Sequence, residues 1–302
     1  MITERKSVTI ENMDKYLGND EQGAVRTVLS LLPVNTPYKV VGHGQDNLIV
    51  LAEDNVYRFP RNQTVWDRAG VEHFVLEVLR EHPGLPTPIL KQVHENPAYT
   101  IATALEGEVL ENQMLWSLPR AQQQKIGEQI GSFAATFHHL FNPDDIRPFL
   151  VEKAPQTRYA SYLKDILTAA KPGNPYYKLT SWVLGEWEKH DHSESTVIHD
   201  DLHTHNMLFD AEYRLTGVLD FGDVNLGNPE QDLRYTYWMG DEVMESAVKA
   251  YEARAGRTLD RDLIRLCALS QEISGLFDEK RLYMHDRAKQ NLAYRSPDLT
   301  CL

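Results

Sequence analysis

Two short motifs in the middle of the chain hold the residue types that phosphoryl transfer requires. The first is HDDLHTHN, in which Asp201 and Asn206 have the spacing DxxxxN, and the second is DFG, which begins at Asp220. Transfer from a nucleoside triphosphate needs a carboxylate that orients the attacking hydroxyl and takes its proton, and oxygen ligands that hold Mg²⁺ against the phosphates. The sequence therefore predicts Asp201 as the catalytic residue and Asn206 and Asp220 as ligands of Mg²⁺.

The elements around these motifs are expected to bring the three residues together. Residues 197–198 end a short buried strand, a loop follows, and residues 207–209 and 214–219 are strands joined by a tight turn. A hairpin that returns over so few residues carries Asp220 back beside Asn206. Two metal-binding oxygens can therefore converge although they are distant in the sequence.

The segments IHDDLHTHN, GVLDFGD and GNPEQDLR resemble the aminoglycoside phosphotransferase family of small-molecule kinases, which belongs to the protein-kinase-like superfamily. The resemblance extends over residues 38–250, and GNPEQDL follows DFG too closely for the activation segment of protein kinases. It implies an α+β, two-lobe kinase-like fold. An antiparallel five-stranded N-lobe is expected in residues 1–103 and a mainly helical C-lobe in residues 104–302. It also implies Mg²⁺ as cofactor and ATP or GTP as co-substrate.

The catalytic segment has a second interpretation. A transition-metal site would use imidazole and carboxylate ligands, and the segment offers His199, His203, His205, Asp200 and Asp201. The DFG motif favours kinase chemistry over this alternative. His199 and Asp232 are expected to be structural, His199 by bracing the loop and Asp232 by tying the following helix to it.

The N-terminal third alternates between strand and helix periodicity. Strands are predicted at 38–41, 48–52, 56–60, 89–94 and 99–103, and a helix is predicted at 64–81. In a kinase-like fold the first turn of this sheet covers the triphosphate, because glycines let backbone N–H groups approach the phosphates. The resemblance therefore assigns Gly42, Gly44 and Asn47 to nucleotide binding.

Arg58 stands on the third strand, where a protein kinase has a lysine. A guanidinium also holds phosphate oxygens and stays charged, so the same role is expected for it, with Arg61 as the alternative. Glu72 on the following helix is expected to pair with Arg58, and is preferred to Glu77 because it keeps the ExxVLxxL pattern of the family.

Residues 104–108 are predicted to form the hinge between the lobes. In relatives the nucleotide base binds backbone groups of this linker, which are here those of Thr103 and Leu105. Backbone bonds leave no signature in the sequence, so ATP and GTP remain equal alternatives. The remaining periodicity predicts helices at 10–32, 122–141, 159–170, 179–190, 242–256, 260–276 and 278–292.

Composition limits the partners. A net charge of −13 argues against a nucleic-acid partner, since phosphate binding requires clustered Lys and Arg, and it suits a cationic substrate. There is no apolar run long enough for a membrane span and no signal core at the N-terminus, and the two cysteines form no disulfide framework. A cytoplasmic protein, monomeric or weakly dimeric, is expected.

The acceptor is expected to be a small, cationic molecule. The resemblance favours an aminoglycoside, whose phosphorylation would inactivate the antibiotic. A macrolide, or a metabolite hydroxyl such as that of an amino alcohol or sugar, is the alternative. Glu272 and Asp278 are the expected acceptor contacts, because the C-terminal helices of relatives form the substrate cleft. A nucleotide-binding pseudokinase is the alternative of another class, and the presence of Asp201, Asn206 and Asp220 counts against it.

Overall fold

The computed structural model describes residues 19–33, 35–41, 46–150, 164–165, 176–190, 196–276 and 282–295. The chain divides into two compact units, unit 1 (Met1–Glu106 and Thr216–Gly222) and unit 2 (Gly107–Leu215 and Asp223–Leu302). It passes from unit 1 to unit 2 within the segment 104–108 that the sequence marks as a hinge. The short segment that contains Asp220 belongs to unit 1. The predicted division of the chain, with a single boundary after residue 103, does not include this return to unit 1.

Unit 1 contains the predicted five-stranded antiparallel sheet. Its strands are β1 (Tyr38–Val41), β2 (Asn47–Ala52), β3 (Asn55–Pro60), β4 (Leu90–Glu95) and β5 (Ala98–Thr103). They are hydrogen-bonded in the order β1-β2-β3-β5-β4, and every neighbouring pair is antiparallel. A two-residue turn joins β2 to β3, and Glu53 takes the positive φ of 50° that a tight hairpin favours.

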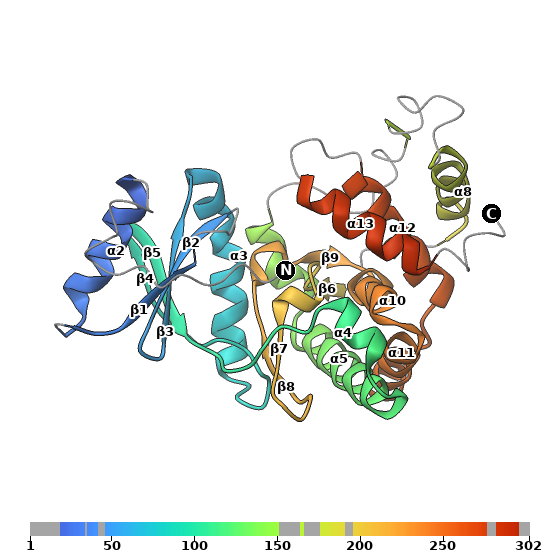
Figure 1. Cartoon of the computed structure of the whole chain (residues 1–302), viewed down its shortest axis with the longest axis horizontal. Coiled ribbons are helices and arrows are strands. Elements are labelled where there is room, and N and C mark those ends of the chain that lie inside the picture. Colours follow the sequence, from blue (N-terminus) through green and yellow to red (C-terminus); the bar gives the residue numbers. More distant parts are fainter. Residues whose placement is uncertain are drawn as a thin grey trace. The chain divides into compact units, whose positions relative to one another are not determined.

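Two helices lie on opposite sides of this sheet in Figure 1, α2 (Asn19–Leu31) and α3 (Gln63–Arg80). Side chains alternate between the two faces of a strand, so the two faces of β3 contact different helices. Tyr57 and Phe59 belong to the buried core that α2 covers. Arg58, which stands between them, therefore has its side chain on the face toward α3.

The start of α3 is fixed by a side-chain cap. The Oδ1 of Asn62 accepts the N–H of Val65 at 3.0 Å, which satisfies one of the unpaired donors of the first turn. The buried face of the helix then carries Val71 and Val75, and Glu72 is buried beside them. A carboxylate on an apolar helix face is costly unless it is paired, so the position of Glu72 indicates a cationic partner.

Unit 2 is mainly helical. Its helices are α4 (Asn112–Ser117), α5 (Arg120–Leu140), α6 (Pro143–Ile146), α8 (Tyr177–Trp187), α9 (Pro229–Asp232), α10 (Thr236–Met239), α11 (Asp241–Ala255), α12 (Arg261–Leu276) and α13 (Leu282–Tyr294). Short strands β6 (Thr196–Ile198) and β9 (Asn225–Gly227) pair antiparallel. Strand β7 (Met207–Phe209) leads through a turn to β8 (Leu215–Val218), within which the boundary between the units falls.

The helices predicted at 122–141, 179–190, 242–256 and 260–276 correspond to α5, α8, α11 and α12, and the one predicted at 278–292 corresponds to α13. Most of the helix predicted at 159–170, and residues 10–18 of that predicted at 10–32, lie outside the described residues. Among the helices that are described, none combines the length and the apolar character that a membrane span requires.

Helices α5 and α11 lie side by side in Figure 1 and approach closely. Glycines make this approach possible, because a Cβ on Gly131 would stand 1.9 Å from the carbonyl oxygen of Ala247. Two helical turns of α5 further on, the pair brings Nδ1 of His138 to 2.9 Å from the hydroxyl oxygen of Tyr251. The close packing therefore positions His138, whose other ring nitrogen contacts a residue of the candidate active site.

Replacing Gly131 by alanine is expected to destabilise the protein by about 1–3 kcal/mol, because the new methyl group meets backbone atoms that cannot move aside cheaply. Gly185→Ala in α8 is the matched control. Nothing lies within 4 Å of its added Cβ, and the change should stabilise by about 0.5–1 kcal/mol. Denaturant titration measures both. An unchanged unfolding midpoint for Gly131→Ala would contradict the close approach of α5 and α11.

Candidate active site

The backbone of the HDDLHTHN loop is held by the buried carboxylate of Asp232, at the end of α9. Its Oδ2 accepts the N–H of His199 at 3.0 Å and its Oδ1 accepts the N–H of Asp200 at 2.8 Å. Nε2 of His138 lies 2.8 Å from Oδ2. Burial raises the pKa of Asp232, but the hydrogen bond and charge of His138 outweigh it, so the pKa lies below the ordinary range. The expected structural role of Asp232 matches this geometry.

Two further features fix the loop immediately before Asp201. Asp200 has a φ of 62°, in the left-handed region that aspartate tolerates better than most residues. The fully buried His199 accepts the N–H of Asp201 on its Nδ1 at 3.3 Å, which is the bracing role expected of it. The backbone that presents Asp201 is thus held at three successive residues.

Both carboxylate oxygens of Asp201 accept hydrogen bonds. The hydroxyl of Tyr235 donates to Oδ1 at 2.8 Å, and Nδ2 of Asn206 donates to Oδ2 at 3.1 Å. Nε2 of His203 lies 3.3 Å from the same Oδ2. The side chain keeps 26% of its surface exposed, so an oxygen lone pair remains accessible to a hydroxyl group.

The environment of Asp201 favours its ionised form. Burial raises its pKa, but the charge and hydrogen bond of His203, the hydrogen bond of Tyr235 and the charge of Arg234 together lower it well below the ordinary range. A carboxylate of such low basicity orients a hydroxyl strongly and removes its proton only late in the reaction. This suits phosphoryl transfer, in which positioning contributes most of the catalysis.

The histidines of the loop do not form a metal site. Nδ1 of His203 accepts the N–H of His205 at 3.1 Å, and its other ring nitrogen faces Asp201. Nε2 of His205 lies 3.1 Å from a carboxylate oxygen of Glu111. Across the described part of the chain, no three His, Cys, Asp or Glu side chains gather as metal ligands would. The geometry therefore counts against the transition-metal interpretation.

Asn206 presents one polar atom away from Asp201. Its Nδ2 donates to the backbone carbonyl of Asp201 at 2.9 Å as well as to the carboxylate. Because both bonds use the amide nitrogen, the amide oxygen is the atom left for another ligand. An amide carbonyl oxygen can serve as a ligand of Mg²⁺. This ion is commonly held by only one or two protein groups together with substrate phosphates.

Unit 1 contains the charged residues predicted to act on the nucleotide, together with Asp220. Nη1 of Arg58 donates to Oε1 of Glu72, which is the predicted pairing, and Nη2 donates to Oδ1 of Asp220 at 3.1 Å. Burial disfavours the charge of Arg58, but Glu72 and Asp220 raise its pKa above the ordinary value. Asp220 has a φ of 65° and a side chain that is 52% exposed. It combines a strained backbone, common at functional positions, with an accessible carboxylate.

The other residues assigned to the nucleotide are placed as follows. Gly42 and Gly44 lie outside the described residues, and Asn47 begins β2. The N–H of Thr103 donates to the carbonyl of Ile89 at 3.0 Å, so that donor is already used. The backbone of Leu105 forms no hydrogen bond with any described residue. Of the two linker positions, Leu105 is therefore the better placed to bind a base.

Glu272 is more deeply buried than the sequence suggested. Only 1% of it is exposed, because α13 covers this part of α12: Nδ2 of Asn291 donates to Oε1 at 2.9 Å, and Nε of Arg287 lies 3.6 Å from the same oxygen. Its Oε2 is buried and has no hydrogen-bond partner in the described part of the chain. Burial raises the pKa of Glu272, although Arg287 and Asn291 act in the opposite direction. Asp278 lies outside the described residues.

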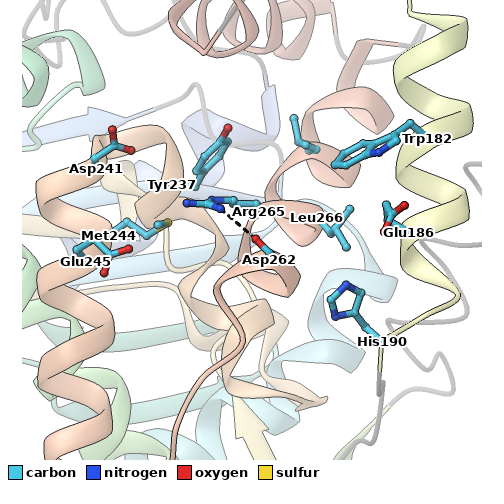
Figure 2. Close-up of a pocket in the computed structure, with 11 residues that line it drawn as sticks. Trp182, Glu186, His190, Tyr237, Asp241, Met244, Glu245, Asp262, Arg265 and Leu266 are labelled. Carbon is cyan, nitrogen blue, oxygen red and sulfur yellow. Dashed lines mark hydrogen bonds and ion pairs between the residues drawn. The ribbon is translucent and has the colours of Figure 1, made fainter. Parts of the chain in front are cut away.

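A separate pocket of about 630 Å³ lies within unit 2 and is drawn in Figure 2. Aromatic, acidic and aliphatic side chains from α8, α10, α11 and α12 line it. Its carboxylates are already paired with cations: Asp262 with Arg265 at 3.0 Å and Glu245 with Arg261 at 3.2 Å. Asp201 is not among its lining residues. We therefore assign no step of the reaction to this pocket.

The family model described as the phosphotransferase enzyme family matches residues 37–267, which include both motifs. The chain belongs to this family. It is therefore a small-molecule O-phosphotransferase, and the resemblance stated from the motifs is confirmed. The chain is similar to the viomycin phosphotransferase of Streptomyces vinaceus, with 26% identity over 224 residues, 69% of this chain and 76% of the relative.

Solved structures of the family share the fold. An aminoglycoside 2′-phosphotransferase-IIIa in its GDP complex has a TM-score of 0.73 at 16% identity, covering 93% of this chain and 99% of that one. A macrolide 2′-phosphotransferase from Brachybacterium faecium has a TM-score of 0.65 at 18% identity, covering 90% and 98%. The expected α+β, kinase-like fold is thereby confirmed.

Sequence reasoning missed two residues that the structure joins to Asp201. Tyr235 donates directly to its carboxylate, and Arg234 lies behind Tyr235 with Nη2 3.2 Å from the hydroxyl oxygen. Both follow the GNPEQDL segment directly, so proximity to that motif was the available signal. No spacing rule, however, assigns a tyrosine at this position to a carboxylate on a different loop.

Replacing Asp201 by asparagine is expected to lower kcat by about a hundredfold or more while leaving nucleotide affinity nearly unchanged, because orienting and accepting the proton matter mainly in the transition state. Steady-state kinetics and equilibrium titration with a nucleotide measure the two quantities. Retention of most of the turnover would show that another group performs this role.

Proposed function

We propose that this phosphotransferase moves the γ-phosphoryl group of ATP or GTP to a hydroxyl of a small antibiotic, with an aminoglycoside as the first candidate. The proposal is carried by the ionised, partly exposed carboxylate of Asp201, held by three side chains on a braced loop. The names of its relatives support an antibiotic, since they include viomycin, aminoglycoside and macrolide phosphotransferases.

The proposed reaction is a direct displacement. The acceptor hydroxyl donates a hydrogen bond to Asp201, and its oxygen forms a bond to the γ-phosphorus. The bond from that phosphorus to the bridging oxygen breaks, and the nucleoside diphosphate leaves with the electron pair. The hydroxyl proton passes to Asp201 late in the transfer and then to solvent. The hydrogen bonds to Asp201 keep its carboxylate oriented throughout.

Mg²⁺ fits the residues that are present. The amide oxygen of Asn206 and the exposed carboxylate of Asp220 are oxygen donors of the kind that this ion prefers, and they would hold it. When bound, the ion would neutralise charge on the triphosphate. Arg58, held as a cation by Glu72 and Asp220, would add a second positive group for the phosphates.

For the nucleotide base we propose the backbone of Leu105 as the binding group. Its N–H and carbonyl have no partner among the described residues, whereas the N–H of Thr103 is used within unit 1. Gly42, Gly44 and Asn47 are proposed for the triphosphate, as the resemblance implies. Solved relatives include complexes with GDP and with ADP, so both ATP and GTP belong in the assay.

On the acceptor side we propose Glu272 and Asp278 as the groups that favour a cation. The support for Glu272 is its buried Oε2, which has no hydrogen-bond partner among the described residues, on a side chain whose pKa the charge of His203 on the catalytic loop helps to lower. An uncompensated buried oxygen is costly. Because Glu272 is 1% exposed beneath α13, we propose that its negative charge favours a cationic acceptor without direct contact.

The experiment that tests the function measures release of nucleoside diphosphate from MgATP and MgGTP with a panel of acceptors. The panel contains kanamycin, gentamicin, viomycin, a macrolide, an amino alcohol and a sugar. Acceptor-dependent release with an aminated antibiotic is expected. Release with the macrolide or with the metabolites alone would assign the enzyme to that class, and binding of nucleotide without any release would favour a pseudokinase.

Asp220→Ala is expected to abolish the Mg²⁺-dependent part of nucleotide affinity, because it removes a carboxylate ligand. Titration with and without Mg²⁺ separates this effect from general damage. In EDTA, the variant should bind the nucleotide no more weakly than the wild type, because Asp220 also pairs with Arg58. If Mg²⁺ strengthens nucleotide binding equally in both proteins, Asp220 is not a ligand.

Glu272→Gln is expected to raise the acceptor KM about tenfold or more while raising Tm. The carboxylate has a pKa above that of an exposed glutamate, so its buried charge costs stability at neutral pH. The stability advantage of the variant should therefore grow as the pH rises through that raised pKa, and vanish at lower pH where both proteins are neutral at this position.

Glu245→Gln on α11 is the matched control, since the same change there removes a carboxylate that pairs with Arg261 rather than one that is buried. It should leave the acceptor KM unchanged. An acceptor KM that also stays unchanged in Glu272→Gln would remove Glu272 from the proposed binding site.

A further inference from the structure

Tyr235 ends a short 3-10 helix, η5 (Leu233–Tyr235), and its side chain reaches the catalytic carboxylate. The residue is 5% exposed, and its hydroxyl donates to Oδ1 of Asp201 at 2.8 Å. The other carboxylate oxygen, Oδ2, faces Asn206 and His203. Tyr235 is therefore the described side chain that holds the Oδ1 end of this carboxylate.

The direction of this hydrogen bond is fixed by Arg234. An arginine can only donate, and its Nη2 lies 3.2 Å from the hydroxyl oxygen of Tyr235. The hydroxyl oxygen therefore accepts from Arg234, and its single hydrogen is directed to Asp201. A hydrogen bond from a donor polarised in this way onto a carboxylate is stronger than one between neutral groups.

Arg234 is itself held rigidly. Its Nη1 donates to Oδ1 of Asp200 at 3.0 Å and to the carbonyl of Gln231 at 2.7 Å, and Nη2 also donates to the carbonyl of Asp200. Only 2% of the residue is exposed. The guanidinium is thus tied to the backbone of the same loop that carries Asp201, so it cannot shift relative to that residue.

The ring of Tyr235 is fixed from two directions. The guanidinium carbon of Arg234 lies 4.4 Å from the ring centroid. The ring of His203 meets it edge-on, with centroids 5.4 Å apart and planes at 85°. A tyrosine has few rotatable bonds, so these two contacts leave its hydroxyl little freedom to move away from Asp201.

We propose that Tyr235, with Arg234 behind it, is a positioning residue for phosphoryl transfer: its hydroxyl holds Oδ1 of Asp201, so that the carboxylate meets the acceptor hydroxyl in one orientation. The proposal rests on the role of Asp201 in the proposed function. Because a small misplacement of a catalytic group costs rate rather than binding, the effect of losing this bond falls on kcat.

Tyr235→Phe tests the proposal, because it keeps the ring contacts and removes only the hydroxyl. Loss of a hydrogen bond to a charged group corresponds to a fall in kcat of about tenfold to a hundredfold. The KM values for the nucleotide and the acceptor should change by about twofold or less. Tyr237→Phe is the matched control: it is as buried, but Arg295 rather than Arg234 lies over its ring, and its kcat should equal that of the wild type.

A double-mutant cycle with Asp201→Asn separates positioning from a general structural effect. If Tyr235 acts through Asp201, adding Tyr235→Phe to Asp201→Asn should change kcat by about twofold or less. The two changes should also couple in the free energy of unfolding, since one removes and the other weakens the same hydrogen bond. The assay uses MgATP or MgGTP with the panel member that the wild type phosphorylates fastest.

Three results would overturn the proposal: a kcat for Tyr235→Phe within about twofold of the wild type, a raised acceptor KM with unchanged kcat, or effects that multiply in the double variant. If the wild type phosphorylates no panel member, the proposed acceptor class fails instead. The same variants are then compared in the release of phosphate from MgATP to water, so that Tyr235 is still tested.

Discussion

The buried carboxylate of Asp232 is the constraint on which the active-site geometry depends. The loop that carries Asp201 turns through a left-handed residue, Asp200, and leaves two backbone N–H groups without a partner inside the loop. Asp232 accepts both, at 3.0 and 2.8 Å, in a site that is 1% exposed. An unpaired buried N–H costs about as much as a lost hydrogen bond. The arrangement of this loop is therefore tied to one side chain, and His138 on α5 in turn contacts that side chain.

The segment after DFG provides the support for the catalytic loop. Strand β9 pairs with β6, the strand that leads into the loop, and Asn228 then caps α9 by accepting the N–H of Gln231 at 2.9 Å. The residues that follow reach back to the loop: Gln231 and Arg234 to Asp200, and Tyr235 to Asp201. A protein kinase has an activation segment after DFG. In this chain, the residues that follow DFG directly hold the catalytic loop instead. The GNPEQDL segment therefore positions groups of the HDDLHTHN motif.

Elements with a strong local signal could be predicted from the sequence. Alternation and turn residues located the five strands, and the resemblance to the family led to the Arg58–Glu72 pair. Contacts that depend on how helices dock could not be predicted in this way. Tyr235 reaches Asp201 only because β9, α9 and η5 place it there. Glu272 lies among apolar residues on the buried face of α12, where the amide of Asn291 on α13 donates a hydrogen bond to it. The sequence of α12 alone does not specify which helix covers that face.

In this enzyme, several buried polar contacts fix one carboxylate, that of Asp201, beside an accessible surface. The most direct test of that account follows the phosphorus itself, by ³¹P nuclear magnetic resonance of the wild-type protein with MgATP or MgGTP and an aminated antibiotic. The account predicts a new phosphomonoester signal on the acceptor, growing in proportion to the nucleoside diphosphate released. Nucleoside diphosphate and inorganic phosphate without any phosphomonoester, across the whole acceptor panel, would contradict it.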